Sequence, residues 1–100
     1  MKLRRIGLAL AMVLLLGGMA FAQDTIRIGV FLPLTGQNAF GGQLELDGVR
    51  MAHEEVAEVL GKKVELIVVD NKSDKVESAN AVKRLIEKEK VVAIIGTYGS

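Results

Sequence analysis

The sequence contains no cysteine, a single proline and only four aromatic residues among its 100 residues. Without cysteine the chain has no disulfide bonds, which many small exported domains use to reinforce a small hydrophobic core. A chain of this size buries only about 60–65% of the surface that its unfolded form exposes, so it is marginally stable alone. We therefore expect these 100 residues to be the front part of a longer protein.

The first 22 residues match a secretory signal peptide. A basic segment, residues 2–5, precedes an almost wholly apolar run over 6–19, and residues 20–22 fit a small-x-small cleavage site. The apolar run is shorter than the ~20 residues of a spanning helix, so an uncleaved anchor is the weaker alternative. We predict cleavage after Ala22 and a periplasmic or other extracytoplasmic location, and the lack of cysteine excludes a lipid anchor on such a residue.

The charge of the chain changes when this leader is removed. The leader carries three of the 13 basic residues, so residues 23–100 hold 10 basic and 12 acidic residues and a formal charge of −2. The overall formal charge of +1 therefore belongs to the leader, and nothing in the composition favours nucleic acid as a partner.

Three apolar strands alternate with two helical patterns after the leader. A continuous apolar run typifies a buried parallel strand, and apolar residues recurring every three or four positions indicate a helix. Asp74 is the expected N-cap of the second helix, with Glu77 at capping-box spacing, and Gly61 the expected stop after the first. Asp70 follows the second strand and is expected to cap the turn that residues 71–74 form. The predicted elements are strand Ile26–Leu32, helix Gln43–Leu60, strand Val64–Val69, helix Lys75–Lys88 and strand Val91–Ile95.

The helical spacing also predicts which side chains pack against the sheet. Gly48, inside the first helix, is expected to be a point of close packing against the sheet. The predicted buried stripes are Leu46, Val49, Ala52, Val56 and Val59/Leu60 on the first helix, and Val76, Ala79, Val82/Lys83 and Ile86, with Leu85 beside them, on the second.

The β-α-β-α-β order predicts an α/β fold with a parallel, Rossmann-like sheet. Crossovers between parallel strands are right-handed, so a strand order of 1-2-3 would place both helices on one face. The order 2-1-3 reverses the second crossover and covers both faces of the first strand, as its apolar run over 28–32 requires. We therefore predict the order 2-1-3.

This order brings the loops after the first and third strands, Thr35–Gly42 and Gly96–Ser100, to one crevice, the place where open α/β sheets bind ligands. Neither loop contains a charged residue. A surface of aromatic rings, hydroxyl groups and glycine backbone suits a small, partly apolar ligand with a polar head. It does not suit acid–base catalysis or a metal ion, so we predict no catalytic residue and no metal ligand.

Two motifs that would indicate other functions fail. The spacing of Gly36 and Gly41 resembles a phosphate-binding loop, but Gly42 and Gln43 stand where that loop requires Lys and then Ser or Thr. No nucleotide or other cofactor is predicted. His53 and the two glutamates that follow it begin like a zinc-protease helix, but the second His is missing, so His53 is expected on the helix surface.

The mature segment resembles the start of periplasmic leucine/isoleucine/valine-binding proteins, the solute receptors of branched-chain amino acid ABC transporters. The resemblance implies that residues 23–100 are the N-terminal part of the first lobe of a type I periplasmic binding fold, whose two lobes close on the ligand. It rests on Ile26–Gly36, Phe40-Gly41, Asp47-Gly48, Val69-Asp70 and Ile94–Ser100.

The resemblance also implies ligand-binding roles for Ser100, Phe40, Tyr98 and Gly41. Ser100 matches the serine that receives the α-carboxylate of the ligand, and Phe40 matches an aromatic position, often Tyr, that lines the pocket before Gly41. Tyr98 shares the loop of Ser100. Phe40 lacks the hydroxyl of the commoner Tyr, which leaves the identity of the ligand open. From the residues alone, a helix N-cap is the favoured role of Ser100, and Phe40 could equally be a hydrophobic staple.

The resemblance implies a receptor that delivers a branched-chain amino acid, or a similar small amino acid or amide, to the membrane permease of an ABC importer. Two alternatives remain at this point. The same fold serves in sensory ectodomains, which continue into a transmembrane helix, and an exported α/β enzyme would need a nucleophile–base pair from residues beyond the two loops.

Overall fold

The computed structural model describes residues 24–99. The predicted signal peptide, its cleavage site and Ser100 lie outside the described residues. The elements are β1 (Thr25–Leu32), α2 (Ala39–Glu55), β2 (Glu58–Val59), β3 (Lys62–Asp70), α3 (Lys75–Glu87) and β4 (Ala93–Ile95). Among these elements, no helix is both long and apolar enough to cross a membrane.

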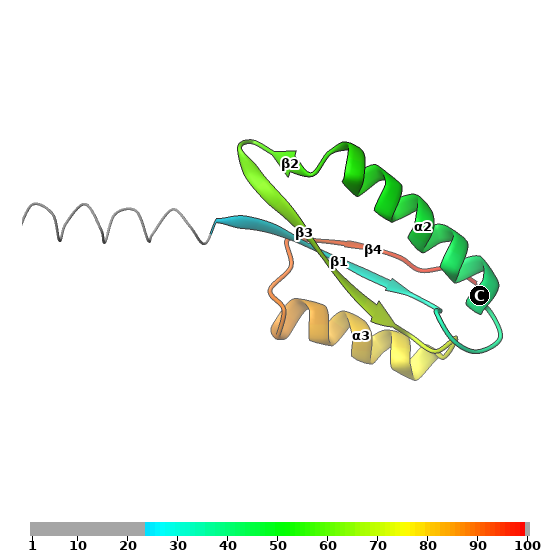
Figure 1. The fold of residues 1–100 in the computed structure, drawn as a ribbon. Helices are drawn as coiled ribbons and strands as arrows, with labels where there is room; N and C mark the ends of the chain where they lie inside the picture. Colours follow the sequence, from blue (N-terminus) through cyan, green and yellow to red (C-terminus); the bar gives the residue numbers. More distant parts are fainter. Residues whose placement is uncertain (1–23, 100) are drawn as a thin grey trace, which may run out of the picture.

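The sheet has the order β2-β3-β1-β4, which confirms that the first strand lies between its two successors (Figure 1). β1 runs parallel to both neighbours: Ile28 pairs with Leu66 of β3 on one side and with Ala93 of β4 on the other. The carboxyl ends of the three parallel strands therefore meet at one edge of the sheet, which we call the carboxyl edge.

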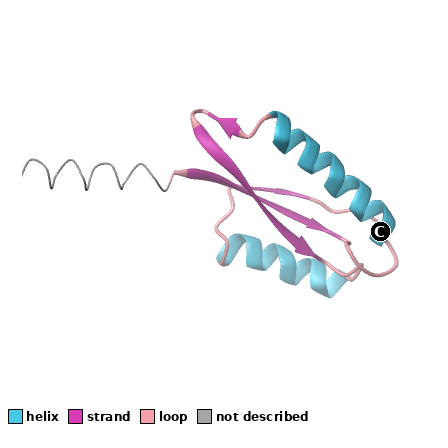
Figure 2. Cartoon of the chain, in the orientation of Figure 1, coloured by secondary structure: helices cyan, strands magenta, loops and turns pink. Residues whose placement is uncertain are grey.

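The two helices lie on opposite sides of the sheet, as the reversed second crossover requires (Figure 2). Alternate residues of β1 therefore face different helices. Val30 and Leu32 are fully buried and pack with Leu46 of α2. On the other face, Leu85 of α3 is fully buried against Gly29. The chain is thus a helix–sheet–helix sandwich with β1 at its centre.

A short antiparallel hairpin, absent from the predicted order, extends the sheet at its outer edge. Val59 pairs with Lys62, and Leu60 and Gly61 form the two-residue turn between them. Both turn residues have positive φ, at 54° and 75°, as a type I′ hairpin turn requires. The prediction of a helix reaching Leu60 was therefore wrong: α2 ends at Glu55, and Gly61 closes a hairpin instead of stopping a helix.

The other end of α2 also differs from the prediction. The helix begins at Ala39, so Phe40, Gly41 and Gly42 lie in its first turn and not in a loop. The reason is a close approach: a Cβ on Gly42 would overlap the carbonyl of Pro33, so only glycine lets the helix start this near to the loop. Gly48, by contrast, has nothing within 4 Å of a built Cβ and is not the predicted packing point.

The predicted stripe of α2 lines a groove that is open within the described residues. Leu46 is buried and Val49 half-buried, whereas Ala52 is exposed. The groove, of about 530 Å³, runs between α2 and the sheet, and its apolar lining includes Ile28, Val49, Val56, Leu66 and Ile95.

The predicted buried face of α3 was wrong. Its tightly buried residues are Ala81 and Leu85, while Val76 and Ile86 are 67% and 55% exposed. Gly29 on β1 explains the difference, because its missing side chain leaves room for Leu85, whose methyl carbons lie 2.9 Å from where a Cβ would be. The rest of the prediction for α3 was accurate: Asp74 caps the helix by accepting a hydrogen bond from the backbone N–H of Glu77 at 2.9 Å.

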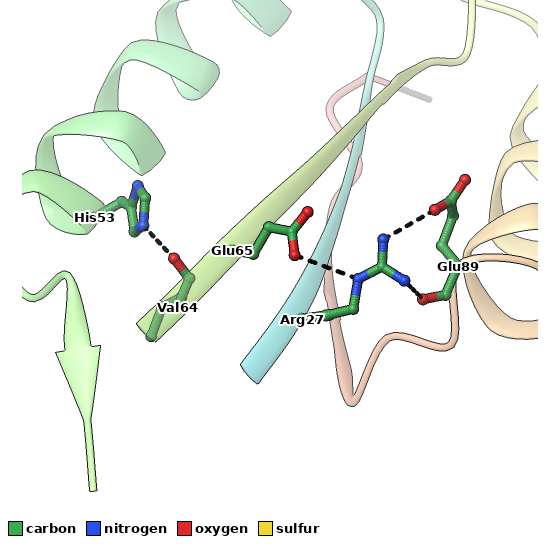
Figure 3. A network of polar contacts seen from close by, with 5 residues as sticks. All are labelled: Arg27, His53, Val64, Glu65 and Glu89. Atoms are coloured by element: carbon green, nitrogen blue, oxygen red, sulfur yellow. Dashed lines mark hydrogen bonds and ion pairs between the residues drawn. The ribbon is translucent and has the colours of Figure 1, made fainter. Parts of the chain in front are cut away.

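Ion pairs hold together the opposite, amino end of the sheet (Figure 3). The guanidinium of Arg27 lies 3.1 Å from the carboxylate of Glu89, just beyond α3, and 3.5 Å from that of Glu65 on β3. His53 of α2 donates a hydrogen bond from Nε2 to the carbonyl of Val64 at 2.7 Å. The histidine expected on the helix surface is therefore a half-buried link between α2 and β3.

Candidate functional site

Three loops converge at the carboxyl edge of the sheet. Residues 33–38 leave β1, residues 71–74 leave β3 and residues 96–99 leave β4. The strand order predicts that the loops after β1 and β4 flank a crevice, because the direction of the crossovers reverses beside β1. We call these two loops the crevice loops. The loop after β3 lies behind them and contacts both.

Asp70, the last residue of β3, holds the loop after β1 with its carboxylate. Oδ1 accepts hydrogen bonds from the backbone N–H groups of Leu34 at 2.9 Å and Thr35 at 3.3 Å, and Oδ2 accepts one from the Thr35 hydroxyl at 2.7 Å. The N–H of Lys72 donates to Oδ1 as well, at 2.8 Å. Burial raises the pKa of Asp70, but these hydrogen bonds outweigh it and leave the pKa below its usual value.

Ser73 makes a second connection between the same two loops. Its hydroxyl donates to the carbonyl of Thr35 at 2.8 Å and accepts from the N–H of Asn38 at 3.0 Å. Gly36 allows this contact, because it has φ of +85° and a Cβ there would lie 2.9 Å from the carbonyl oxygen of Lys72. The loop after β1 is thus pinned along its length to the loop after β3.

Asn71 connects the loop after β3 to the loop after β4. Its side chain donates from Nδ2 to the hydroxyl of Thr97 at 2.8 Å, and its Oδ1 accepts from the N–H of Ser73 at 3.1 Å. Its own N–H donates to the carbonyl of Leu32 at 3.0 Å. With 3% of its surface exposed, it is a buried polar residue whose side-chain oxygen and nitrogen are both satisfied.

The two crevice loops also touch each other directly. The ring of Tyr98 lies so close to Gly41 that a Cβ there would overlap it, and a Cβ on Gly99 would meet the side-chain amide of Asn38 at 2.6 Å. Gly41, in the first turn of α2, permits this close approach because it has no side chain, and its partner is an aromatic ring.

The structure describes three of the four predicted site residues, namely Phe40, Gly41 and Tyr98. Tyr98 and Gly41 are brought together, and Tyr98 keeps 42% of its surface exposed. Phe40 lies beside them in the first turn of α2 and is 81% exposed, so its ring is free of the core of the described chain. Ser100, the fourth predicted residue, lies outside the described residues.

A polar hollow of about 330 Å³ opens beside these loops. Its lining combines the loop after β4 with the start of α3, and it includes Asn38, Asn71, Ser73, Thr97, Tyr98 and Gly99. The larger apolar groove under α2 has few polar groups to orient a ligand, so its size does not make it the better candidate.

The chemistry available at this edge is that of hydrogen bonding and stacking. Residues 33–42 and 96–99 carry no charged side chain. No group of three or more His, Cys, Asp or Glu residues suited to a metal ion occurs in the part of the chain that the structure describes. The carboxylate of Asp70 is engaged by backbone and hydroxyl donors, and that of Asp74, which lines the hollow, caps α3.

Sequence reasoning missed the roles of Asp70, Asn71 and Ser73. It assigned Asp70 to the following turn and 71–74 to a turn cluster, since such residues form turns through their own side chains. The signal that was present is the position of these polar residues at the end of β3 and directly after it, at the carboxyl edge.

Comparisons with known proteins agree with this architecture. The family model described as "Periplasmic binding protein" matches residues 25–100. A protein of Pseudomonas aeruginosa named "Amino acid binding protein" is 31% identical to 99% of this chain, which covers 28% of that relative. The chain thus spans about a quarter of this relative's length.

Two solved structures are similar in both fold and sequence. A leucine-binding protein of Thermotoga maritima is 47% identical over 76% of this chain and 22% of its own, with a TM-score of 0.74. A branched-chain amino acid transporter substrate-binding protein of Streptococcus pneumoniae, solved with isoleucine, is 33% identical over 73% of this chain and 22% of its own, with a TM-score of 0.71.

Proposed function

This chain belongs to the periplasmic binding protein family, and on that premise we propose that the mature protein is an extracytoplasmic solute-binding receptor. It binds a branched-chain amino acid, or a similar small amino acid or amide, and delivers it to the membrane permease of an ABC importer. The residues described here form the front part of its first lobe, after a leader removed behind Ala22.

One observation carries the proposal. The loops after β1 and β4 meet at the carboxyl edge of the sheet, where Tyr98 lies against Gly41 and neither loop is charged. An amino acid with an apolar side chain needs hydrogen-bond donors for its carboxylate and an apolar wall, and it needs no catalytic group. The relatives named for leucine binding and solved with isoleucine support this ligand class.

Each predicted site residue has a distinct role in this proposal. Ser100 donates its hydroxyl to the α-carboxylate of the ligand. Phe40 covers the apolar part of the ligand with the ring that the described chain leaves exposed. Tyr98 forms the wall between them, and Gly41 leaves space for the Tyr98 ring. The receptor uses no cofactor and performs no chemical step on the ligand.

Titration calorimetry of the full-length mature protein tests the ligand class. We expect saturable binding of leucine, isoleucine or valine, and a panel with alanine, small amides and urea tests neighbouring chemistries. Ser100→Ala removes a hydrogen bond to a charged group, so affinity should fall about ten- to a hundredfold. Asn80→Ala, on α3, is the control and should bind as the wild type does. Absence of binding across the panel would contradict the proposal.

Uptake measurements separate delivery to an importer from sensing. In cells that lack the gene, uptake of the radiolabelled ligand should fall and should recover when the wild-type gene is restored. A protein that binds the ligand but whose loss leaves uptake unchanged would instead fit a sensory ectodomain.

A further inference from the structure

The loop after β3 contacts both crevice loops through side chains to which no ligand contact is assigned above. Asp70 and Ser73 hold the loop after β1, and Asn71 holds the loop after β4 at Thr97. These contacts join residues 26 to 38 positions apart in the sequence. The loop after β3 therefore adds hydrogen bonds to two segments that otherwise meet through the packing of Tyr98 on Gly41 and of Gly99 on Asn38.

Two residues of the loop after β3 have a left-handed backbone conformation, which the side chains of Asp70 and Asn71 stabilise. Lys72 and Ser73 have φ of 56° and 57°, a left-handed conformation that costs a non-glycine residue about 1–2 kcal/mol. The carboxylate of Asp70 accepts from the N–H of Lys72, and the amide oxygen of Asn71 accepts from the N–H of Ser73. Each side chain thus stabilises the left-handed residue two positions on, which keeps the loop in one shape.

We propose that Asp70 and Asn71 are positioning residues for ligand binding, which fix the two crevice loops relative to each other before the ligand arrives. The proposal rests on the function proposed above. It adds that the first-lobe half of the site is held in its binding geometry by Asp70 and Asn71, whose hydrogen bonds fix the loops that carry the ligand-binding residues. Pre-organisation of this kind raises affinity by removing the entropy cost of ordering a loop on binding.

The Asn71–Thr97 contact is the sharpest place to test this, because it is the side-chain hydrogen bond that reaches the loop carrying Tyr98. Thr97→Val in the full-length protein removes the hydroxyl and keeps the shape. Affinity for the ligand found by calorimetry should fall about three- to tenfold, as loss of one neutral hydrogen bond predicts. Thr97→Ser keeps the hydroxyl and should stay within twofold of the wild type.

Thr25→Val is the matched control, since it makes the same chemical change at the start of β1, at the amino end of the sheet. It should leave affinity unchanged. If Thr97→Val, Thr97→Ser and the wild type bind equally well, the positioning role is wrong while the receptor function stands. If the wild type binds nothing in the panel, the receptor function fails.

Hydrogen exchange of the unliganded protein tests the positioning role independently of any ligand. Amide exchange over residues 96–99 should be several-fold faster in Thr97→Val and in Asn71→Ala than in the wild type and Thr25→Val. The double variant should exchange at the rate of Asn71→Ala alone, because both changes remove the same contact. Unchanged exchange over 96–99 in both single variants would overturn the proposal.

Discussion

The two ends of the sheet are held together by different chemistry. At the amino end, long charged side chains such as Arg27, Glu65 and Glu89 bridge separate elements (Figure 3). At the carboxyl edge, short side chains bind backbone groups of neighbouring loops, and among these contacts in the described residues Asp70 is the charged partner. The first arrangement relies mainly on ion pairs between long side chains, whereas the second fixes the backbone of each loop through hydrogen bonds from short side chains.

This difference teaches where function is placed in the fold. Ion pairs between flexible side chains tolerate small displacements, because their geometry is loosely defined and their strength falls with salt. A backbone N–H that donates to a carboxylate, or a ring that packs on a glycine, tolerates little displacement. Changes at the carboxyl edge should therefore alter ligand affinity and stability together, and changes at the amino end should alter stability alone.

The largest change in the free energy of unfolding is expected at Gly42, where the backbone of α2 packs on the backbone of Pro33. Gly42→Ala forces its Cβ into the carbonyl of Pro33, so α2 must shift, at a cost of about 1–3 kcal/mol in the free energy of unfolding. Gly48→Ala, in the same helix with open space around it, should instead stabilise by up to about 1 kcal/mol. Urea unfolding of the full-length protein measures both. Equal effects would show that helix propensity, and not the close approach, governs this helix.

The next effect is a dependence of stability on pH that belongs to Asp70. Its hydrogen bonds hold the pKa of the folded state below the usual value of 3.8. The contribution of the ionised Asp70 carboxylate to the free energy of unfolding is therefore complete above about pH 4. It is lost as the pH falls through the lowered pKa. At pH 7, Asp70→Asn should reduce the free energy of unfolding by about 1–3 kcal/mol.

The comparison of wild type and Asp70→Asn is made by urea unfolding from pH 7 to pH 2. The gap between the two proteins should narrow only below about pH 4. A gap that stays constant down to pH 2 would mean that the ionised carboxylate is not what holds the loop after β1.

At the amino end we expect a smaller effect, confined to stability. Arg27→Gln removes the ion pairs with Glu89 and Glu65 and should lower the free energy of unfolding by about 1–2 kcal/mol. Part of this loss in the free energy of unfolding should disappear in about 0.5 M salt, because salt screens the more exposed pair, Arg27 with Glu65. Ligand affinity by calorimetry should stay within twofold of the wild type, and a larger loss of affinity would remove the distinction between the two ends.

The strand order and the start of α3 could be predicted from the sequence, because the residue pattern of the element concerned and the order of the elements were sufficient. Handedness and the apolar run of β1 determined the strand order, and Asp74 with Glu77 marked the start of α3. The uncharged crevice loops were read directly from the residues. These features depend on local chemistry and chain connectivity, which a sequence states explicitly.

The features that sequence reasoning missed depend on a second element. Leu85 is buried because Gly29, far along the chain, leaves room for it, and no helical spacing contains that information. The hairpin at Leu60 was hidden because Val59 and Leu60 continue the apolar spacing of the helix, and the turn lacks the Asn-Gly pair that would mark it. Asp70 was assigned to a turn because the sequence does not say which loop lies beside it.

The smallest effect is expected at the exposed pair of Lys62 and Asp24, 3.2 Å apart near the start of β3 and β1. The side chains of Lys62 and Asp24 are 43% and 58% exposed, so Lys62→Gln should change the free energy of unfolding by less than about 0.5 kcal/mol. Together with Arg27→Gln this measures whether ion pairs at the amino end contribute in proportion to their burial. A loss as large as that of Arg27→Gln would mean that the hairpin, where Lys62 pairs with Val59, anchors this end of the sheet more than the Arg27 network does.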